Sequence, residues 1–302
     1  MKTLVIATRK SALALWQANF VKRELERYHA GLDVQLLGMT TRGDQWLNAP
    51  LRELGGKGLF IKELESALLS GEAHIAVHSL KDLPAIIPDE FTLGAVGYRA
   101  DVHDVLVGVS GGIASLPQGA RVGTSSLRRQ SQLLAQRADL VVSPIRGNVG
   151  TRLDKLTNGE FDAIVLAAAG LDRLGVNLPV RSTLSLEDSL PAAGQAALGV
   201  ECLAGAKEVL SLLLPLNDER VARCVATERL VSAGLGADCS MPVAAYAEIS
   251  GSEIRLRALL ASADGRQILR AEAMGLEPAT TAHQVVASLK AMGADDILRT
   301  LR

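Results

Sequence analysis

The chain has 302 residues, of which 48% are hydrophobic and 22% are charged, and its formal net charge is −1. This length favours two or three globular domains over a single one, and the composition excludes the disordered, collagen-like and low-complexity classes. No apolar run approaches the roughly 18 residues of a membrane-spanning helix, and the near-zero charge argues against a general nucleic-acid or membrane binder. Three cysteines without a CxxC pair, and an N-terminal apolar patch too short for a secretory signal, favour a cytoplasmic protein.

The first two thirds of the chain alternate short β-branched runs with helical patterns, which is typical of βαβ units around a mostly parallel sheet. The first series comprises strands at Thr3–Thr8, Asp33–Met39 and Ile75–Val77 and helices at Ser11–Tyr28 and Leu59–Leu69. The second comprises a strand ending at Val122, a helix from Ser126, a strand at Leu140–Ser143, a helix from Val149 and a strand at Asp162–Leu166. We expect two α/β domains of similar design, joined near residues 98–104 and again near 190–196.

After about residue 217 the pattern changes to a helix followed by strands with hairpin turns. The expected elements are a helix at Asp218–Ser232, strands at Val243–Ile249, Glu253–Ala261 and Gln267–Met274, and a helix at His283–Met292. We therefore predict three domains: residues 1–98 with 196–215, residues 103–191, and a small α+β domain at residues 217–302.

Basic and hydroxyl residues recur where predicted strands end and helices begin. In parallel α/β sheets these ends collect ligands, because helix N-termini present free N–H groups there. The four segments concerned are Ala7–Ser11, His78–Asp82, Gly123–Arg129 and Arg146–Arg152. We expect them to converge on a cleft between the two α/β domains that binds a polyanionic ligand.

The stretch Arg121–Arg152 holds six arginines, no lysine and one acid, a formal +5 in a near-neutral protein. The guanidinium fork matches carboxylates and phosphates bidentately, although a solvated basic face is an equally good reading. Arg128 and Arg129 fall in the first turn of a predicted helix, where cations oppose the helix dipole. We expect a bound anion to offset that cost.

Two further residues have both a structural and a functional interpretation. Asp82 lies beside Lys81 and is either a salt-bridge partner or a carboxylate that stabilises a cationic intermediate. Cys239 lies in a loop of small residues and is either an inert thiol or an attachment point. Cys202, in an apolar stretch that we predict to be helical (Ala197–Leu203), and Cys224, within a helix, are expected to be packed and inert.

Several common motifs are absent or incomplete. The stretch from Gly55 to Gly58 fails the Walker pattern, because Gly58 replaces the required Ser or Thr, but Lys57 is available to an anion. His74 and His78 flank a strand, which makes a zinc site improbable, and we predict no metal.

The motifs, in this order over essentially the whole chain, strongly resemble the porphobilinogen deaminase (hydroxymethylbilane synthase) family. The matching stretches are Ala7–Gln17, Thr41–Asp44, Gly55–Phe60, His78–Pro84, Val122–Gln130 and Arg146–Arg152. The resemblance implies a transferase of porphyrin and haem biosynthesis that condenses four porphobilinogen molecules head to tail, releases ammonia, and yields hydroxymethylbilane by hydrolysis. Growth starts on a covalent dipyrromethane cofactor held by a thioether, and the matching cysteine is Cys239.

The resemblance also assigns site residues and a fold. Asp82 falls on the aspartate that holds pyrrole N–H groups and stabilises the azafulvene cation. The positions matching those that bind cofactor or substrate carboxylates are Arg9, Ser11, Lys81, Thr124, Ser126, Arg128, Arg129, Arg146 and Arg152. The implied fold is two α/β domains like those of type II periplasmic binding proteins, plus an α+β C-terminal domain with a three-stranded antiparallel sheet.

This sequence departs from the family pattern at three places. Asp238 precedes Cys239 where glycine is usual, His103 replaces an arginine, and Ala196 replaces a glycine of the hinge. None removes a catalytic group, so we expect an active enzyme. We also expect a monomer with a small-molecule substrate and no nucleic-acid or membrane partner. The alternative function is a non-catalytic anion-binding protein of the periplasmic-binding type, which needs neither Asp82 nor Cys239 and normally carries a signal peptide.

Overall fold

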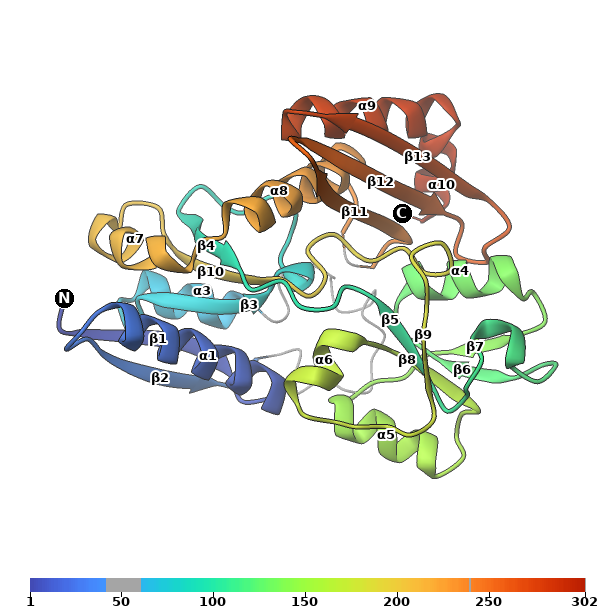
Figure 1. Ribbon diagram of the computed structural model, residues 1–302, viewed down its shortest axis with the longest axis horizontal. Coiled ribbons are helices and arrows are strands. Elements are labelled where there is room, and N and C mark those ends of the chain that lie inside the picture. Colours follow the sequence, from blue (N-terminus) through green and yellow to red (C-terminus); the bar gives the residue numbers. More distant parts are fainter. Residues whose placement is uncertain (42–60, 239, 302) are drawn as a thin grey trace. The chain divides into compact units, whose positions relative to one another are not determined.

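The computed structural model describes residues 1–41, 61–238 and 240–301 (Figure 1). They form two compact units, Met1–Ala100 with Ala196–Arg223, and Asp101–Gln195 with Cys224–Arg302. The chain therefore passes from the first unit to the second after Ala100, and returns to the first at Ala196.

The first unit is built on a five-stranded sheet with the order β2-β1-β3-β10-β4. Strands β1, β2 and β3 are parallel, and β10 runs antiparallel to both β3 and β4. The strands are β1 (Thr3–Arg9), β2 (Asp33–Met39), β3 (Ile75–Ser79), β4 (Phe91–Gly97) and β10 (Leu198–Leu203). The helices are α1 (Ala12–Tyr28), α3 (Lys62–Leu69) and α7 (Lys207–Leu213), with short 3₁₀ turns η1 (Leu80–Asp82) and η3 (Leu214–Leu216).

Alternation along β1 explains how this sheet is covered on both faces. Leu4 and Ile6 pack with the apolar stripe of α1, whereas Ala7 packs with Leu64 and Leu68 of α3. Successive side chains of a strand point to opposite faces, so one buried strand serves two helix layers.

The second unit contains two sheets. One has the order β7-β6-β8-β5-β9, with β6 parallel to β7 and β8, and β5 antiparallel to β8 and β9. Its strands are β5 (Asp104–Val107), β6 (Arg121–Gly123), β7 (Val141–Ser143), β8 (Ala163–Ala167) and β9 (Arg181–Thr183). Its helices are α4 (Leu127–Gln136), α5 (Val149–Thr157) and α6 (Ala168–Arg173), with the turn η2 (Ile113–Ser115). In both sheets four strands run in one direction, and a single antiparallel strand, β10 or β5, lies next to one edge, so the plan of the first unit is repeated.

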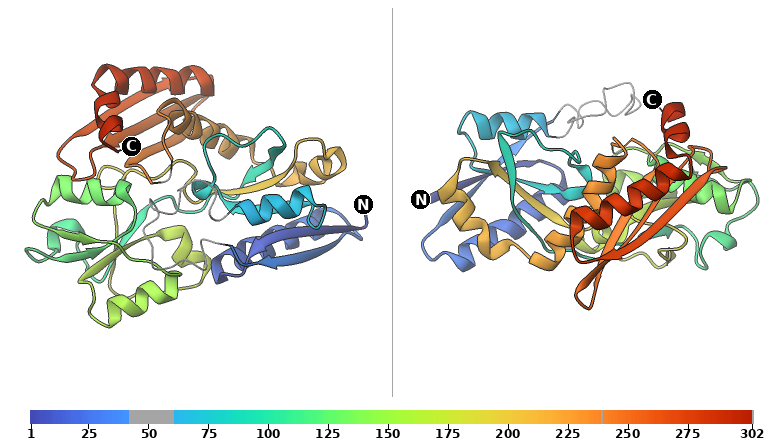
Figure 2. Two further views of the ribbon diagram at one scale, coloured as in Figure 1. Left: turned by 180° about the vertical axis from the view of Figure 1, so that it is seen from behind. Right: turned by 90° about the horizontal axis from the view of Figure 1, so that it is seen from above.

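The other sheet of this unit is antiparallel, in the order β11-β12-β13. Helix α9 lies along one face of it, and the two share an apolar core (Figures 1 and 2). The strands are β11 (Val243–Ser250), β12 (Glu253–Ala261) and β13 (Ile268–Gly275), and the helices are α9 (Pro278–Ala291) and α10 (Ala294–Leu301). Helix α8 (Glu219–Gly234) begins in the first unit and belongs to the second from Cys224 on. Two mixed α/β sheets of one plan and a three-stranded antiparallel sheet confirm the predicted fold class, whereas the three-domain division stays a prediction.

The prediction for Cys202 was wrong in one respect. Residues 198–203 form strand β10 rather than a helix, because this apolar run hydrogen-bonds to β3 on one side and to β4 on the other. Cys202 is nevertheless fully buried, and Cys224 is buried within α8.

The return crossing contains a strained residue. Ala196 has φ +69°, a conformation that costs an L-residue about 1–2 kcal/mol and that glycine adopts freely. A glycine at this position would relieve that strain. The Ala196 carbonyl accepts a hydrogen bond from the Ala100 amide (3.1 Å).

Candidate active site

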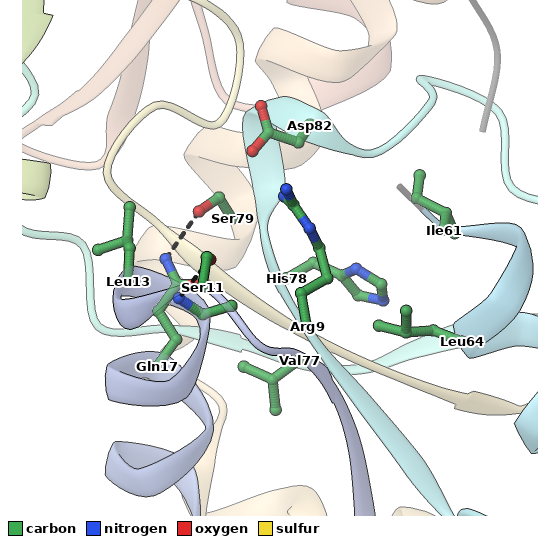
Figure 3. Close-up of a pocket in the computed structure, with 11 residues that line it drawn as sticks. Arg9, Ser11, Leu13, Gln17, Ile61, Leu64, Val77, His78, Ser79 and Asp82 are labelled. Carbon is green, nitrogen blue, oxygen red and sulfur yellow. Dashed lines mark hydrogen bonds between the residues drawn. The ribbon is translucent and has the colours of Figure 1, made fainter. Parts of the chain in front are cut away.

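A pocket in the first unit lies at the carboxyl ends of β1 and β3 (Figure 3). Arg9 ends β1, Ser11 follows it, and Asp82 ends the 3₁₀ turn after β3. Because β1 and β3 are parallel neighbours, two segments some 70 residues apart in the sequence meet at one edge of the sheet. The Arg9 guanidinium points toward the Asp82 carboxylate (Figure 3).

Local hydrogen bonds fix the walls of this pocket. Ser11 caps α1, and its hydroxyl oxygen accepts the Ala14 amide at 3.3 Å. Across the pocket Gln17 donates to the Ser79 hydroxyl at 2.7 Å. Asp82 is exposed and faces this framework, so its charge is available to a ligand. The half-buried Lys81 is on the same 3₁₀ turn but does not line the pocket.

A buried hydrogen bond supports one wall of the pocket. The Nε2 atom of His78, which lines the pocket, is 3.0 Å from the Glu201 carboxylate, and both side chains are almost wholly buried. Burial, and then the charge of Glu201, raise the pKa of the nearby Glu65. His74 instead accepts the Val5 amide at its Nδ1. Among the described residues, no cluster of three or more His, Cys, Asp or Glu is arranged to hold a metal ion.

The arginines of α4 are held inside the second unit. Arg128 and Arg129 are 4% and 7% exposed, and they contact the two oxygens of Asp104 at 2.8 and 2.7 Å. The sequence predicted that a bound anion offsets the unfavourable interaction of these two cations with the helix dipole. In the structure the Asp104 carboxylate, which belongs to the protein itself, provides a negative charge there. Burial lowers the pKa of Arg128, and the Asp104 charge opposes that shift. Asp104 itself was not among the predicted site residues.

The turn before α4 presents hydroxyls. Thr124 is buried, and its Oγ1 accepts the Ser126 amide at 3.1 Å. Ser126 takes the N-cap position but makes no side-chain capping bond, so its hydroxyl is not used by the helix. Ser125 donates to the Ile145 carbonyl at 2.7 Å and ties this turn to the segment that follows β7.

The next predicted turn of the second unit opens α5. Asn148 caps that helix by accepting the Thr151 amide at 2.9 Å. The Arg152 Nε atom donates to the Gly147 carbonyl at 2.8 Å, and Arg146 is half-buried at the start of the turn. Both arginines of the Arg146–Arg152 motif thus sit at a helix N-terminus, as the sequence predicted.

Two predicted site residues, Lys57 and Cys239, lie outside the described residues. Asp238, which departs from the family pattern, accepts the Ser240 amide at 2.9 Å and the Ser240 hydroxyl at 2.5 Å. Its carboxylate is therefore engaged in a local turn. A second departure, His103, has its Nδ1 atom 2.5 Å from the Asp101 carboxylate.

Of the helices that the structure describes, none is both long and apolar enough to cross a membrane.

Comparisons with known proteins place this architecture in a family. Residues 4–211 match the model described as "Porphobilinogen deaminase, dipyromethane cofactor binding domain", and residues 222–292 match its C-terminal domain. Porphobilinogen deaminase of Bordetella parapertussis is 52% identical over 100% of this chain and 97% of its own length. That of Thiobacillus denitrificans is 48% identical over 100% and 99%.

Among solved structures, a probable amino-acid ABC transporter extracellular-binding protein from Bacillus subtilis aligns with 71% of this chain and 93% of its own, with TM-score 0.46 and 12% identity.

The family matches together span nearly the whole chain, and the relatives align from end to end at about half identity. The chain belongs to the porphobilinogen deaminase family.

Proposed function

We propose that this protein is a hydroxymethylbilane synthase, which joins four porphobilinogen molecules head to tail with loss of ammonia and releases hydroxymethylbilane by hydrolysis. The observation that carries this proposal is the pocket at the ends of β1 and β3, where the Asp82 carboxylate faces the Arg9 guanidinium. A substrate that becomes cationic when ammonia leaves, and that keeps its acidic side chains, calls for both charges. A protein that only binds anions has no use for Asp82.

Asp82 is the residue that we assign to the chemical step. Its exposed carboxylate can accept pyrrole N–H groups and sit close to the carbon that becomes positive as ammonia departs. Arg9 alongside it can hold a carboxylate of the same pyrrole, which orients the ring toward Asp82. The Ser11 oxygen accepts one amide from α1, and its proton is left to donate to a ligand carboxylate.

We assign the arginine and hydroxyl turns of the second unit to carboxylates of the pyrrole chain. The Arg129 Nε atom is buried and has no hydrogen-bond partner, so a donor is available for an acidic ligand. Thr124 and Ser126 each keep a hydroxyl proton to donate. The further residues assigned to this role by their family positions are Lys57, Lys81, Arg128, Arg146 and Arg152.

These residues fit the dipyrromethane cofactor, whose acidic side chains match the donors. When bound, the cofactor supplies the primer to which pyrroles are added. We assign its attachment to Cys239, because the other two cysteines, Cys202 and Cys224, are buried in β10 and α8. A thiol must be accessible to form a thioether.

An intact mass spectrum of the purified protein tests this assignment. We expect a mass greater than that of the sequence by two linked pyrrole units, a positive reaction with Ehrlich's reagent, and an adduct that peptide mapping places on Cys239. Cys239→Ala should lose both adduct and porphobilinogen turnover, whereas the control Cys224→Ala should keep both. An unmodified mass from active enzyme, or an adduct on either buried cysteine, would contradict the assignment.

Four further properties stay predictions from the sequence. We expect a cytoplasmic monomer with no nucleic-acid or membrane partner, and three domains with the boundaries given above. Light scattering at several concentrations checks the monomer, and limited proteolysis checks the boundaries.

A further inference from the structure

Asp104, the first residue of β5, is a fully buried carboxylate that two arginines share. Its Oδ2 accepts Arg128 at 2.8 Å and its Oδ1 accepts Arg129 at 2.7 Å. The Ser189 hydroxyl and the Gln195 amide also donate to it, at 2.8 and 3.0 Å. Asp104 thereby ties α4 to the segment that leads back to the first unit.

Each guanidinium also has an anchor on the backbone. Arg128 donates to the Leu190 carbonyl at 2.6 Å, and Arg129 donates to the Val165 carbonyl of β8 at 2.9 Å. A planar group bonded at two separate points cannot rotate freely, so the carboxylate and the carbonyls together define where each guanidinium plane lies.

The charges of these three side chains do not cancel. Two arginines face one aspartate, which leaves one positive charge in excess inside the protein. In addition, the Arg129 Nε–H is buried without an acceptor. An excess charge and an unsatisfied buried donor both cost stability, and a purely structural bridge needs neither. Both features are accounted for if an anionic ligand completes the cluster.

We propose that Asp104 is a positioning residue, which neutralises one arginine and fixes both guanidiniums so that the pair presents a single positive charge to one carboxylate of the bound pyrrole chain. This inference rests on the proposed function, in which Arg128 and Arg129 bind such carboxylates. Asp104 itself touches no substrate. It acts through the two arginines.

The first test moves the carboxylate without changing its charge. Asp104→Glu keeps the ion pairs but displaces their acceptor by one methylene, so we expect a folded protein with KM for porphobilinogen raised about tenfold and kcat per cofactor-loaded molecule changed less. The matched control is Asp162→Asn, which breaks an exposed Arg–Asp bridge to Arg121 in the same unit and should leave KM unchanged. A wild-type KM in Asp104→Glu would overturn the proposal.

The second test separates positioning from charge balance. Asp104→Asn alone leaves two buried positive charges, so we expect a marked fall in Tm. The double variant Asp104→Asn with Arg129→Gln restores the original excess of one charge, so Tm should recover. Its cofactor loading, read from the intact mass, should still fall below that of Arg129→Gln alone, which keeps Asp104. Recovery of Tm with loading equal to that of Arg129→Gln would show that Asp104 only balances charge, and would overturn the proposal.

Failure of the inference and failure of the proposed function give different results. If the wild-type protein carries no cofactor and consumes no porphobilinogen, the proposed function is wrong. If the wild type is active and Asp104→Glu matches it in KM and loading, only the role of Asp104 is wrong.

Discussion

Asp82→Asn removes a negative charge from the pocket and leaves the size of the side chain unchanged. Asp82 is exposed and ends a short 3₁₀ turn, so the substitution disturbs no buried contact. We expect the free energy of unfolding to change by no more than about 0.5 kcal/mol, as for other surface substitutions. Any large effect must therefore fall on the reaction.

The expected loss of rate follows from Coulomb's law. A carboxylate about 4 Å from a developing unit charge stabilises it by about 4 kcal/mol at an effective dielectric of about 20, and by about 1 kcal/mol in bulk water. Each 1.4 kcal/mol is about tenfold in rate, so kcat should fall roughly 10³-fold if bound substrate excludes water, and roughly fivefold if it does not. Because Asp82 lines a pocket beside Arg9, we expect the larger value.

The assay is single-turnover consumption of porphobilinogen by cofactor-loaded enzyme, with Tm measured on the same sample. The matched control is Asp89→Asn, an exposed aspartate in the turn before β4 that does not line the pocket. It should match the wild type in both readouts. A kcat for Asp82→Asn within threefold of wild type, at full cofactor loading, would refute the assigned role.

Three predictions concern stability. Gly265→Ala should lower the free energy of unfolding in urea by about 1–3 kcal/mol more than Gly251→Ala does. Both glycines have positive φ, but only at Gly265 would an added Cβ meet backbone, at 2.3 Å from the Ser131 carbonyl oxygen. Equal losses would mean that the β12–β13 turn does not pack on α4. Glu228→Gln should cost about 1–3 kcal/mol, because each oxygen of this buried carboxylate accepts a backbone amide, and the NH₂ that replaces one oxygen cannot accept. An unchanged unfolding midpoint would contradict this. Burial raises the pKa of Cys202 to about 11, so the folded protein favours the neutral thiol. The resulting contribution to the free energy of unfolding is fully present below the unfolded pKa of about 8.5 and is lost as pH rises toward 11. Native Cys202 should resist alkylation at pH 8 and react only on unfolding, and rapid labelling of the native protein would contradict its placement.

The core of each α/β sheet could be predicted because local and long-range signals agree there. Helix α1 has a capping serine, an apolar stripe and buried neighbours in β1, so its predicted and observed limits differ by one residue. The three parallel strands predicted for each sheet also contain β-branched residues and are bounded by turn residues. Where the local sequence pattern agrees with the tertiary packing, the sequence alone predicts the element.

Strands β4 and β10 could not be predicted, because glycines interrupt the side-chain pattern that is typical of a strand. At Gly94 an added Cβ would lie 2.5 Å from Leu213, and at Gly199 it would lie 2.6 Å from Leu80. These glycines let helices and turns approach the sheet closely, a reason that appears only once the chain is folded. The apolar run of β10 was therefore predicted as helix, and no element was predicted for β4.

The arginine-rich stretch shows what a charge count along a chain leaves out. At least four of its six arginines pair with a carboxylate in the structure, and only Asp139, the partner of Arg137, lies within the same stretch. Asp104 meets α4 because β5 inserts antiparallel beside β8, with Asp104 opposite Ala167, an arrangement that no local pattern encodes. The sequence therefore overstated the free positive charge of the segment. What it could not supply was the partner that turns two buried arginines into a site of defined charge and orientation.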